Sequence, residues 1–186
     1  MSNAKPQLII ISGPPGAGKT RLARPLANRM GLPLFSKDAI KEQLADSLGE
    51  HSAGISRELG LASVMQVYAI AGEMLRAGQS LIIEGAFHKG LAEQDLAPIL
   101  PLADTTLVHV QADDELLMSR YEKRATDPDR HPIHEDAARL SDLKHYLAEG
   151  VVGPLDIDCH LVSIDTTYGS IDVEEVAFMI QDRDDE

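Results

Sequence analysis

The strongest constraint on the fold of this chain is a run of small and rigid residues between an expected strand and an expected helix. Residues 7–11 (QLIII) are continuously apolar, which is typical of a strand buried on both faces. Residues 12–20 (SGPPGAGKT) follow directly, and residues 19–30 are helical in character, with Pro25 as a defect that should bend the helix or disturb its start. This order of elements is typical of parallel α/β proteins.

The run between strand and helix matches the pattern G-x-x-x-x-G-K-[ST] from Gly13 to Thr20. Glycine accepts backbone conformations that other residues avoid, so that successive amide N–H groups can turn toward one anion at the start of the helix. Such a loop predicts a nucleoside triphosphate site, in which Lys19 reaches the β- and γ-phosphates and the Thr20 hydroxyl ligates Mg²⁺. The residues expected to bind ATP here are Gly13, Pro15, Gly16, Ala17, Gly18, Lys19, Thr20 and Arg21.

The rest of the chain continues the alternation of strands and helices. Further strands are expected at 32–36, 80–87, 105–112 and 160–165. Helices are expected at 38–47, 56–77 (capped by Ser56), 90–102 (ended early by Pro98 and Pro101), 113–126, 135–149 and 172–182. The pattern predicts one domain over residues 5–182 with a five-stranded parallel sheet and ligands beyond the carboxyl ends of its strands. Residues 1–4 are interpreted as a tag remnant and 183–186 as an acidic tail.

Composition narrows the class of partner. The chain carries 17 Lys and Arg against 30 Asp and Glu, a formal net charge of −13, and this balance counts against an extended nucleic-acid footprint. The lone cysteine, Cys159, cannot form an internal disulfide, which favours a reduced, cytoplasmic setting. No apolar run approaches the ~20 residues of a membrane span. A small molecule is therefore the expected partner, and no sequence feature indicates an oligomeric state.

Two carboxylates lie at the carboxyl ends of the apolar runs of expected strands. Asp38 comes just after the strand at 32–36, where it could orient or accept the proton of an attacking hydroxyl, or cap a helix that begins at Ala39. Glu84 follows the buried run of the strand at 80–87, where it could hold Mg²⁺ through a water molecule or contact the acceptor. His88, a few residues further on, is interpreted as a polar loop residue or an acceptor contact.

Residues 120–136 concentrate basic side chains in an acidic chain. Arg120 and Arg124 share a helix face, and Arg130 follows a Pro-containing break. Arginines that close over a triphosphate neutralise the charge of the transition state, so that this segment is expected to be a small helical lid. The alternative is a solvated helix face, which is as good an interpretation as the lid for Arg120. The fold expected overall is the three-layer α/β/α P-loop NTPase fold with this lid.

Four stretches of the chain together resemble the P-loop kinase-like proteins: GPPGAGKT, LFSKDAIKEQL, LIIEGAF and DRHPIHED. This group includes gluconate-kinase-like enzymes, chloramphenicol phosphotransferase, zeta toxins and the kinase domain of polynucleotide kinases, and the resemblance spans about residues 7–170. It implies that Asp38 acts on the acceptor hydroxyl and that the lid arginines bind phosphates. It also implies that the loop 165–170, with Thr167, lies near the adenine. Many of these relatives have an aspartate where this chain has Glu84.

The expected function is an ATP-dependent kinase that phosphorylates a hydroxyl group of a small molecule. Lys19, Asp38, Arg120 and Arg124 are the expected catalytic residues, Arg124 and Arg130 are expected to bind the nucleotide as well, and Thr20 and Glu84 are expected to hold Mg²⁺. Residues 48–61 are expected to line the acceptor pocket. Two alternatives stay open: a switch driven by ATP hydrolysis, and a kinase of polynucleotide or nucleotide 5′ ends.

Overall fold

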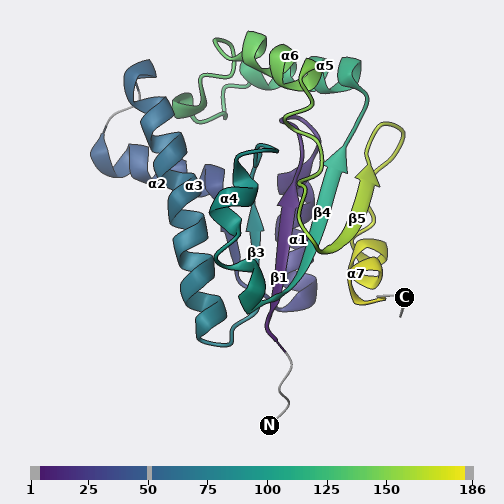
Figure 1. Ribbon diagram of the computed structural model, residues 1–186. Coiled ribbons are helices and arrows are strands. Elements are labelled where there is room, and N and C mark those ends of the chain that lie inside the picture. The colour runs from purple at the N-terminus through teal and green to yellow at the C-terminus, as the bar shows by residue number, and fades with distance from the viewer. Residues whose placement is uncertain (1–4, 50–51, 183–186) are drawn as a thin grey trace.

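A computed structural model of the protein describes residues 5–49 and 52–182. The expected tag remnant and acidic tail lie outside these residues. The described chain forms a parallel sheet with strand order β2-β3-β1-β4-β5 (Figure 1). The strands are β1 Gln7–Ser12, β2 Leu34–Ser36, β3 Leu81–Glu84, β4 Asp104–Gln111 and β5 His160–Asp165. The five-stranded α/β fold predicted from the alternation is confirmed.

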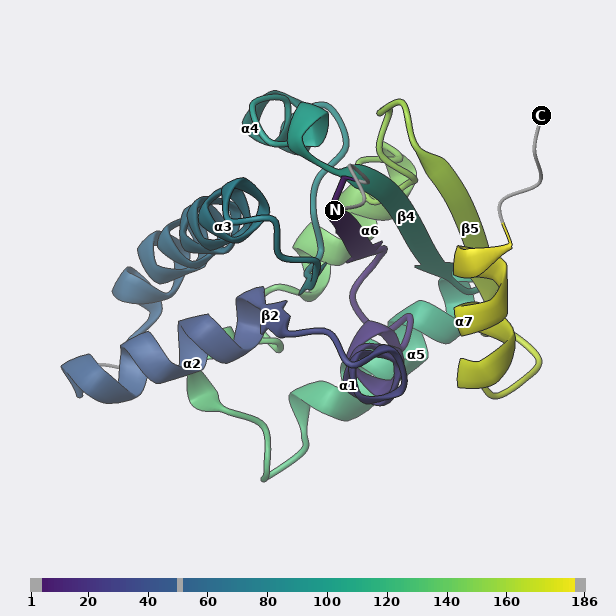
Figure 2. The same cartoon turned by 90° about the horizontal axis from the view of Figure 1, so that it is seen from below.

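Helices cover both faces of this sheet, as the view from below shows (Figure 2). Helices α1 and α7 pack on one face, and α3 and α4 pack on the other. Helices α5 and α6 lie across the carboxyl ends of the strands (Figure 1). The helix bounds are α1 Lys19–Met30, α2 Lys37–Leu48, α3 Ala53–Arg76, α4 Ala92–Leu96, α5 Asp114–Ala125, α6 Leu140–Ala148 and α7 Val173–Gln181, with 3₁₀ turns η1 Leu100–Leu102 and η2 Pro132–His134.

Strand β1 lies at the centre of the core and positions the glycine-rich loop. Apart from Gln7 at its start, every residue of β1 is buried, because the strand lies in the middle of the sheet between β3 and β4. Its register places Ile11 beside Glu84 of β3 and Val108 of β4. The chain leaves β1 at Ser12, so that the glycine-rich loop emerges at the same edge as the end of β3. Among residues 5–49 and 52–182, none of the helices combines the length and the apolar character that spanning a membrane requires.

Some expected boundaries are wrong for physical reasons. Ser56 does not cap α3, because the helix begins at Ala53 and the buried Ser56 hydroxyl donates to the carbonyl of Ile133 instead. The expected helix 135–149 is shortened to α6, since Glu135 adopts a left-handed backbone with φ 52° and ends the preceding turn. The strand expected at 80–87 stops at Glu84, and residues 85–88 line a cavity instead.

Position 13 requires a glycine, because the backbone of Val110 approaches it closely. Its φ is +137°, and a Cβ there would lie 2.0 Å from the carbonyl oxygen of Val110. We expect Gly13→Ala to lower the free energy of unfolding by roughly 3 kcal/mol or more, through strain and overpacking. Gly31→Ala is the matched control, because Gly31 has φ +66° with nothing within 4 Å, and should cost about 1 kcal/mol. Urea unfolding of both variants checks this, and equal losses would contradict it.

Candidate functional site

The glycine-rich loop leaves a group of backbone donors free. Gly13, Gly16 and Gly18 have positive φ angles of 137°, 86° and 98°. Within the described chain, no hydrogen-bond acceptor faces the amide N–H groups of residues 16, 18, 19 and 20, whereas the Arg21 amide already donates to the Gly18 carbonyl at 3.0 Å. Free amides at the start of a helix form a binding site for an anion. The geometry therefore fits the phosphate tail that the motif predicts.

Lys19 is the cation of this loop. Its Nζ donates to the carbonyl oxygens of Gly13 at 2.8 Å and of Pro14 at 2.9 Å, so that the ammonium lies against the loop. Burial lowers the pKa of Lys19 to about 8, and the nearby carboxylates of Glu84 and Asp38 only partly offset this effect. The ammonium is thus held where an additional anion would stabilise its charge.

Glu84 lies between two hydroxyl groups. Ser36 Oγ donates to its Oε2 at 2.6 Å, and Thr20 Oγ1 donates to its Oε1 at 3.4 Å. Burial raises the pKa of Glu84, while Lys19 and the Ser36 hydroxyl act in the opposite direction. A carboxylate and a hydroxyl in contact supply the hard oxygen ligands that Mg²⁺ prefers, so that the residues present fit this ion.

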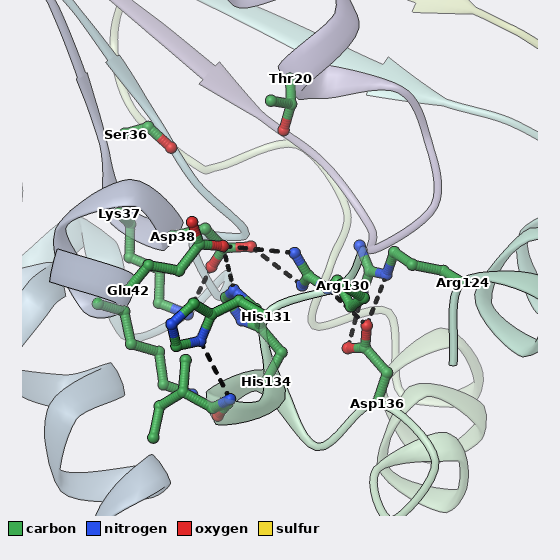
Figure 3. Close-up of polar contacts among 12 residues, drawn as sticks. Thr20, Ser36, Lys37, Asp38, Glu42, Arg124, Arg130, His131, His134 and Asp136 are labelled. Carbon is green, nitrogen blue, oxygen red and sulfur yellow. Dashed lines mark hydrogen bonds and ion pairs between the residues drawn. The ribbon is translucent and has the colours of Figure 1, made fainter. Parts of the chain in front are cut away.

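Asp38 lies in the first turn of α2, two residues after the end of β2. It is not the N-cap residue, because the helix already begins at Lys37. Its Oδ1 accepts from Lys37 Nζ at 3.2 Å, and its Oδ2 lies 3.7 Å from Arg130 Nη2 (Figure 3). Burial opposes the charge, yet Lys37, His134 and Arg130 hold the pKa of Asp38 well below its usual range. Asp38 is therefore an ionised acceptor of hydrogen bonds.

Two lid arginines converge on one buried carboxylate that sequence reasoning missed. Arg124 Nη2 donates to Asp136 Oδ1 at 3.0 Å, and Arg130 Nε donates to Asp136 Oδ2 at 2.8 Å (Figure 3). The Arg124 guanidinium also lies over the Tyr121 ring at 4.7 Å. The signal that could have found Asp136 is the excess of arginines around it, since clustered arginines need a counter-charge when they are partly buried.

Arg120 has a different arrangement. It donates to the Thr166 hydroxyl and carbonyl at 2.9 Å each and to the Gly16 carbonyl at 3.3 Å, which connects the glycine-rich loop to the segment after β5. Thr167, the expected adenine neighbour, accepts a hydrogen bond from the Asp113 amide at 2.9 Å. Arg120 therefore holds loops together, whereas the ion pairs of Arg124 and Arg130 among the described residues are with Asp136 and with carboxylates of α2.

The lid segment, defined as residues 120–136, is docked on helix α2 by its last residues. His134 Nε2 lies 2.6 Å from Glu42 Oε1 (Figure 3), and His131 Nε2 lies 3.1 Å from Asp46 Oδ1. The carbonyl of Ile133 accepts from Lys41 Nζ at 3.0 Å. These contacts place the arginines of the lid segment beside the start of α2, where Asp38 lies.

An open cavity of about 1230 Å³ joins these groups. Its wall includes most of the residues predicted from the sequence, namely Pro15, Gly16, Gly18, Lys19, Thr20, Arg21, Asp38, Glu84, His88, Arg120, Arg124 and Arg130. Gly13, Ala17 and Thr167 are not among its lining residues. Of the segment 48–61, only the end, from Arg57 to Leu61, contributes, and residues 50–51 lie outside the described chain.

The cavity reverses the charge balance of the chain. Ten of the 17 Lys and Arg line it, against seven of the 30 Asp and Glu, counted over the described residues. The basic ones are Lys19, Arg21, Lys37, Lys41, Arg57, Lys89, Arg120, Arg124, Arg130 and Arg139. The acidic ones are Asp38, Glu58, Glu84, Asp95, Asp136, Asp142 and Glu149. A cationic cavity in an acidic protein favours anionic ligands.

Comparison with known proteins identifies a family model and several kinases that are similar to this chain. A family model described as an AAA domain matches residues 8–149. A solved structure from Chloroflexus aurantiacus, of a protein provisionally described as a kinase, has 33% sequence identity and a TM-score of 0.86, and the match covers 95% of this chain and 97% of that one. The cytidylate kinase of Pyrobaculum neutrophilum is 26% identical over 171 residues, 88% of this chain and 86% of the relative. A sugar kinase from a Janibacter species shares the fold, with 19% identity, a TM-score of 0.64 and coverage of 96% and 95%.

Proposed function

Because the chain belongs to the AAA-domain family, among its P-loop kinase-like members, we propose that it is an ATP-dependent kinase that phosphorylates a hydroxyl group of a small molecule. The observation that carries the proposal is one cavity that contains the free amides around Lys19 and the ionised Asp38. The first group suits a triphosphate, and the second suits the molecule that receives its terminal phosphoryl group. We propose a cytoplasmic setting, as expected for a chain with a single cysteine.

The glycine-rich loop binds the phosphate tail of ATP in this proposal. The free amides of residues 16 and 18–20 donate to phosphate oxygens, and Lys19 exchanges its two loop carbonyls for the β- and γ-phosphates. Thr20 and Glu84 would hold Mg²⁺, which would supply positive charge beside the phosphates. Arg120 keeps the loop in position through its bonds to Gly16 and Thr166.

Asp38 orients the acceptor in the transfer step. Its carboxylate accepts a hydrogen bond from the acceptor hydroxyl, whose oxygen then forms a bond to the γ-phosphorus as the bond to the β,γ-bridging oxygen breaks and ADP leaves. The hydroxyl proton passes to Asp38 and then to solvent. Because the pKa of Asp38 is low, the group is ready to accept this hydrogen bond at neutral pH.

The arginines of the lid segment neutralise charge on the transferring group. In the structure, Arg124 and Arg130 both pair with Asp136. Arg130 Nη2 also lies 3.7 Å from Asp38 Oδ2. We propose that the lid segment moves when ATP binds and brings one or both guanidinium groups to the phosphates, since an anion of higher charge competes with the single carboxylate of Asp136.

The affinity for ATP should fall as the pH rises above about 8. The pKa of Lys19 lies at about 8 in the free protein, so that below this pH the charged form is already present and above it a proton must be taken up on binding. We expect about tenfold weaker binding at pH 9 than at pH 7. Lys19→Arg stays charged over this range and should show a flat profile. Titration calorimetry measures both, and a flat profile in the unmodified protein would refute this role for the Lys19 pKa.

The proposed function is tested by an acceptor screen. The full chain is incubated with ATP, Mg²⁺ and a panel of hydroxylated metabolites and antibiotics, and the formation of ADP is measured with and without each compound. The kinase proposal expects ADP formation that depends on one class of acceptor, with a product heavier by one phosphoryl group. Rapid ADP formation without any acceptor, stimulated by a protein partner, would instead support a switch.

A nucleotide acceptor is the second candidate function. The similarity to a cytidylate kinase over most of both chains supports it, and the cationic cavity is compatible with a phosphorylated acceptor. Nucleoside monophosphates and oligonucleotides with a free 5′ hydroxyl therefore belong in the same screen.

A further inference from the structure

We propose that the acceptor carries an anionic group, a carboxylate or a phosphate, that binds to a cationic cluster formed by Lys37, Lys41 and Arg139. The inference rests on the proposed kinase function and deepens it, because it names a chemical class for the acceptor. Lys37 and Lys41 belong to α2, Arg139 directly precedes α6, and all three line the cavity. We call these residues the cationic cluster.

Lys41 is a buried cation with neutral partners. The residue is 1% exposed, and its Nζ donates to Ser56 Oγ at 2.8 Å and to the Ile133 carbonyl at 3.0 Å. Among the described residues no carboxylate lies within ion-pair distance of it, and Asp38 and Glu135 act on it only at longer range. Burial, followed by repulsion from Lys37 and Arg139, lowers its pKa to about 8. A buried ammonium without a counter-charge is costly, so that a nearby anion would stabilise this arrangement.

Arg139 supplies the donors that an anion needs. Its Nη2 donates to the same Ser56 hydroxyl at 3.0 Å, so that two cations share one neutral oxygen. No ion pair involves Arg139 in the described part of the chain, although a guanidinium has five N–H donors in a planar fork. This fork matches the paired oxygens of a carboxylate or a phosphate. Arg139 is therefore the residue expected to contact the anion directly.

Lys37 connects the cationic cluster to the reacting end of the cavity. Its Nζ lies 3.2 Å from Asp38 Oδ1, and its charge also lowers the pKa of His88 after the larger effect of burial. An anion at the cationic cluster would thus lie within the span of one small molecule from the carboxylate that orients the hydroxyl. An acceptor whose anionic group binds to the cationic cluster would thereby have its hydroxyl group placed beside Asp38.

The test measures binding of matched probe pairs to the full chain with Mg²⁺ and a non-hydrolysable ATP analogue. One arm compares hydroxycarboxylates with the neutral polyols of the same carbon skeleton, and the other compares sugar phosphates with the parent sugars. We expect at least one anionic probe to bind at least about tenfold more tightly than its neutral partner, in calorimetry and thermal shift. The arm that responds distinguishes a carboxylate from a phosphate. Equal binding of both members, or no binding of any anionic probe, would overturn the inference.

Variants then assign the effect to the cationic cluster. Arg139→Gln should weaken binding of the anionic probe by about ten- to hundredfold, and Arg139→Lys should keep a substantial part of it. Arg24→Gln, on the exposed side of α1, is the matched control and should bind as the unmodified protein does. Unchanged anion binding by a folded Arg139→Gln variant would overturn the assignment. Since Arg139 is partly buried, folding is verified by circular dichroism and by ATP binding.

The two proposals fail in different ways. If an anionic probe binds as expected but no ADP forms from ATP, the kinase function is wrong and the anion site remains. If a neutral acceptor is phosphorylated while the anionic probes do not bind, the kinase function stands and the cationic cluster does not read the acceptor.

Discussion

Asp38→Asn should reduce acceptor-dependent turnover by a factor of about 10² to 10⁴ while the affinity for ATP stays nearly unchanged. The amide is close to the carboxylate in size, but it cannot take up the hydroxyl proton and offers a single carbonyl oxygen as acceptor. The residue lies at the start of α2, and the triphosphate is expected at the start of α1, so that the substitution leaves the nucleotide site intact. Initial rates of ADP formation and ATP titrations measure the two properties separately.

Asp142→Asn is the matched control for this result. Asp142 also lines the cavity, is exposed on α6, and should lose little turnover when its charge is removed. If Asp38→Asn turns over at the rate of the unmodified protein, Asp38 has no part in the mechanism. If Asp142→Asn is equally impaired, the effect reflects the charge of the cavity rather than the position of Asp38.

Lys19→Met should weaken ATP binding by about a hundredfold and reduce turnover at saturating ATP by a factor of about 10³. The thioether side chain keeps much of the volume of lysine, but the loop loses the cation that is expected to reach the β- and γ-phosphates. The carbonyls of Gly13 and Pro14 also lose the Lys19 ammonium as their hydrogen-bond donor, although water molecules can donate to them instead.

Lys5→Met serves as the control, because Lys5 is exposed before β1, at the opposite end of that strand from the loop. Thermal unfolding shows whether the Lys19→Met variant is folded. ATP binding by folded Lys19→Met with the affinity of the unmodified protein would mean that the ammonium does not contact the nucleotide.

Much of the sheet could be predicted because its signals are local. Residues 7–11 and 160–165 are short apolar or alternating runs between turns, and both are strands in the structure. The glycine-rich loop could be predicted for the same reason, since its motif needs only its own residues and the flanking elements. The strand order could not be read in this way, because it depends on which surfaces pack together over long separations.

The placement of candidate site residues could be predicted where they lie at the ends of strands. Asp38 follows β2 and Glu84 is the last residue of β3, and adjacent parallel strands end at the same edge of a sheet. Lys41 could not be assigned, because its partners Ser56 and Ile133 lie in other elements and no local pattern links them. Asp136 was missed although its partners lie in the same segment, because the arginines around it were assigned to phosphate binding alone. Ser56 was assigned to a helix cap by propensity, but its hydroxyl donates to the Ile133 carbonyl, 77 residues away in sequence, at 2.7 Å.

Titration of the unmodified protein with ATP, ADP and AMP in the presence of Mg²⁺ tests the central claim most directly. If the amides around Lys19 bind the phosphate tail, each terminal phosphate removed should weaken binding, and AMP should bind at least about a hundredfold more weakly than ATP. AMP that binds as tightly as ATP, or ATP that does not bind at all, would contradict the claim that this loop is the triphosphate site.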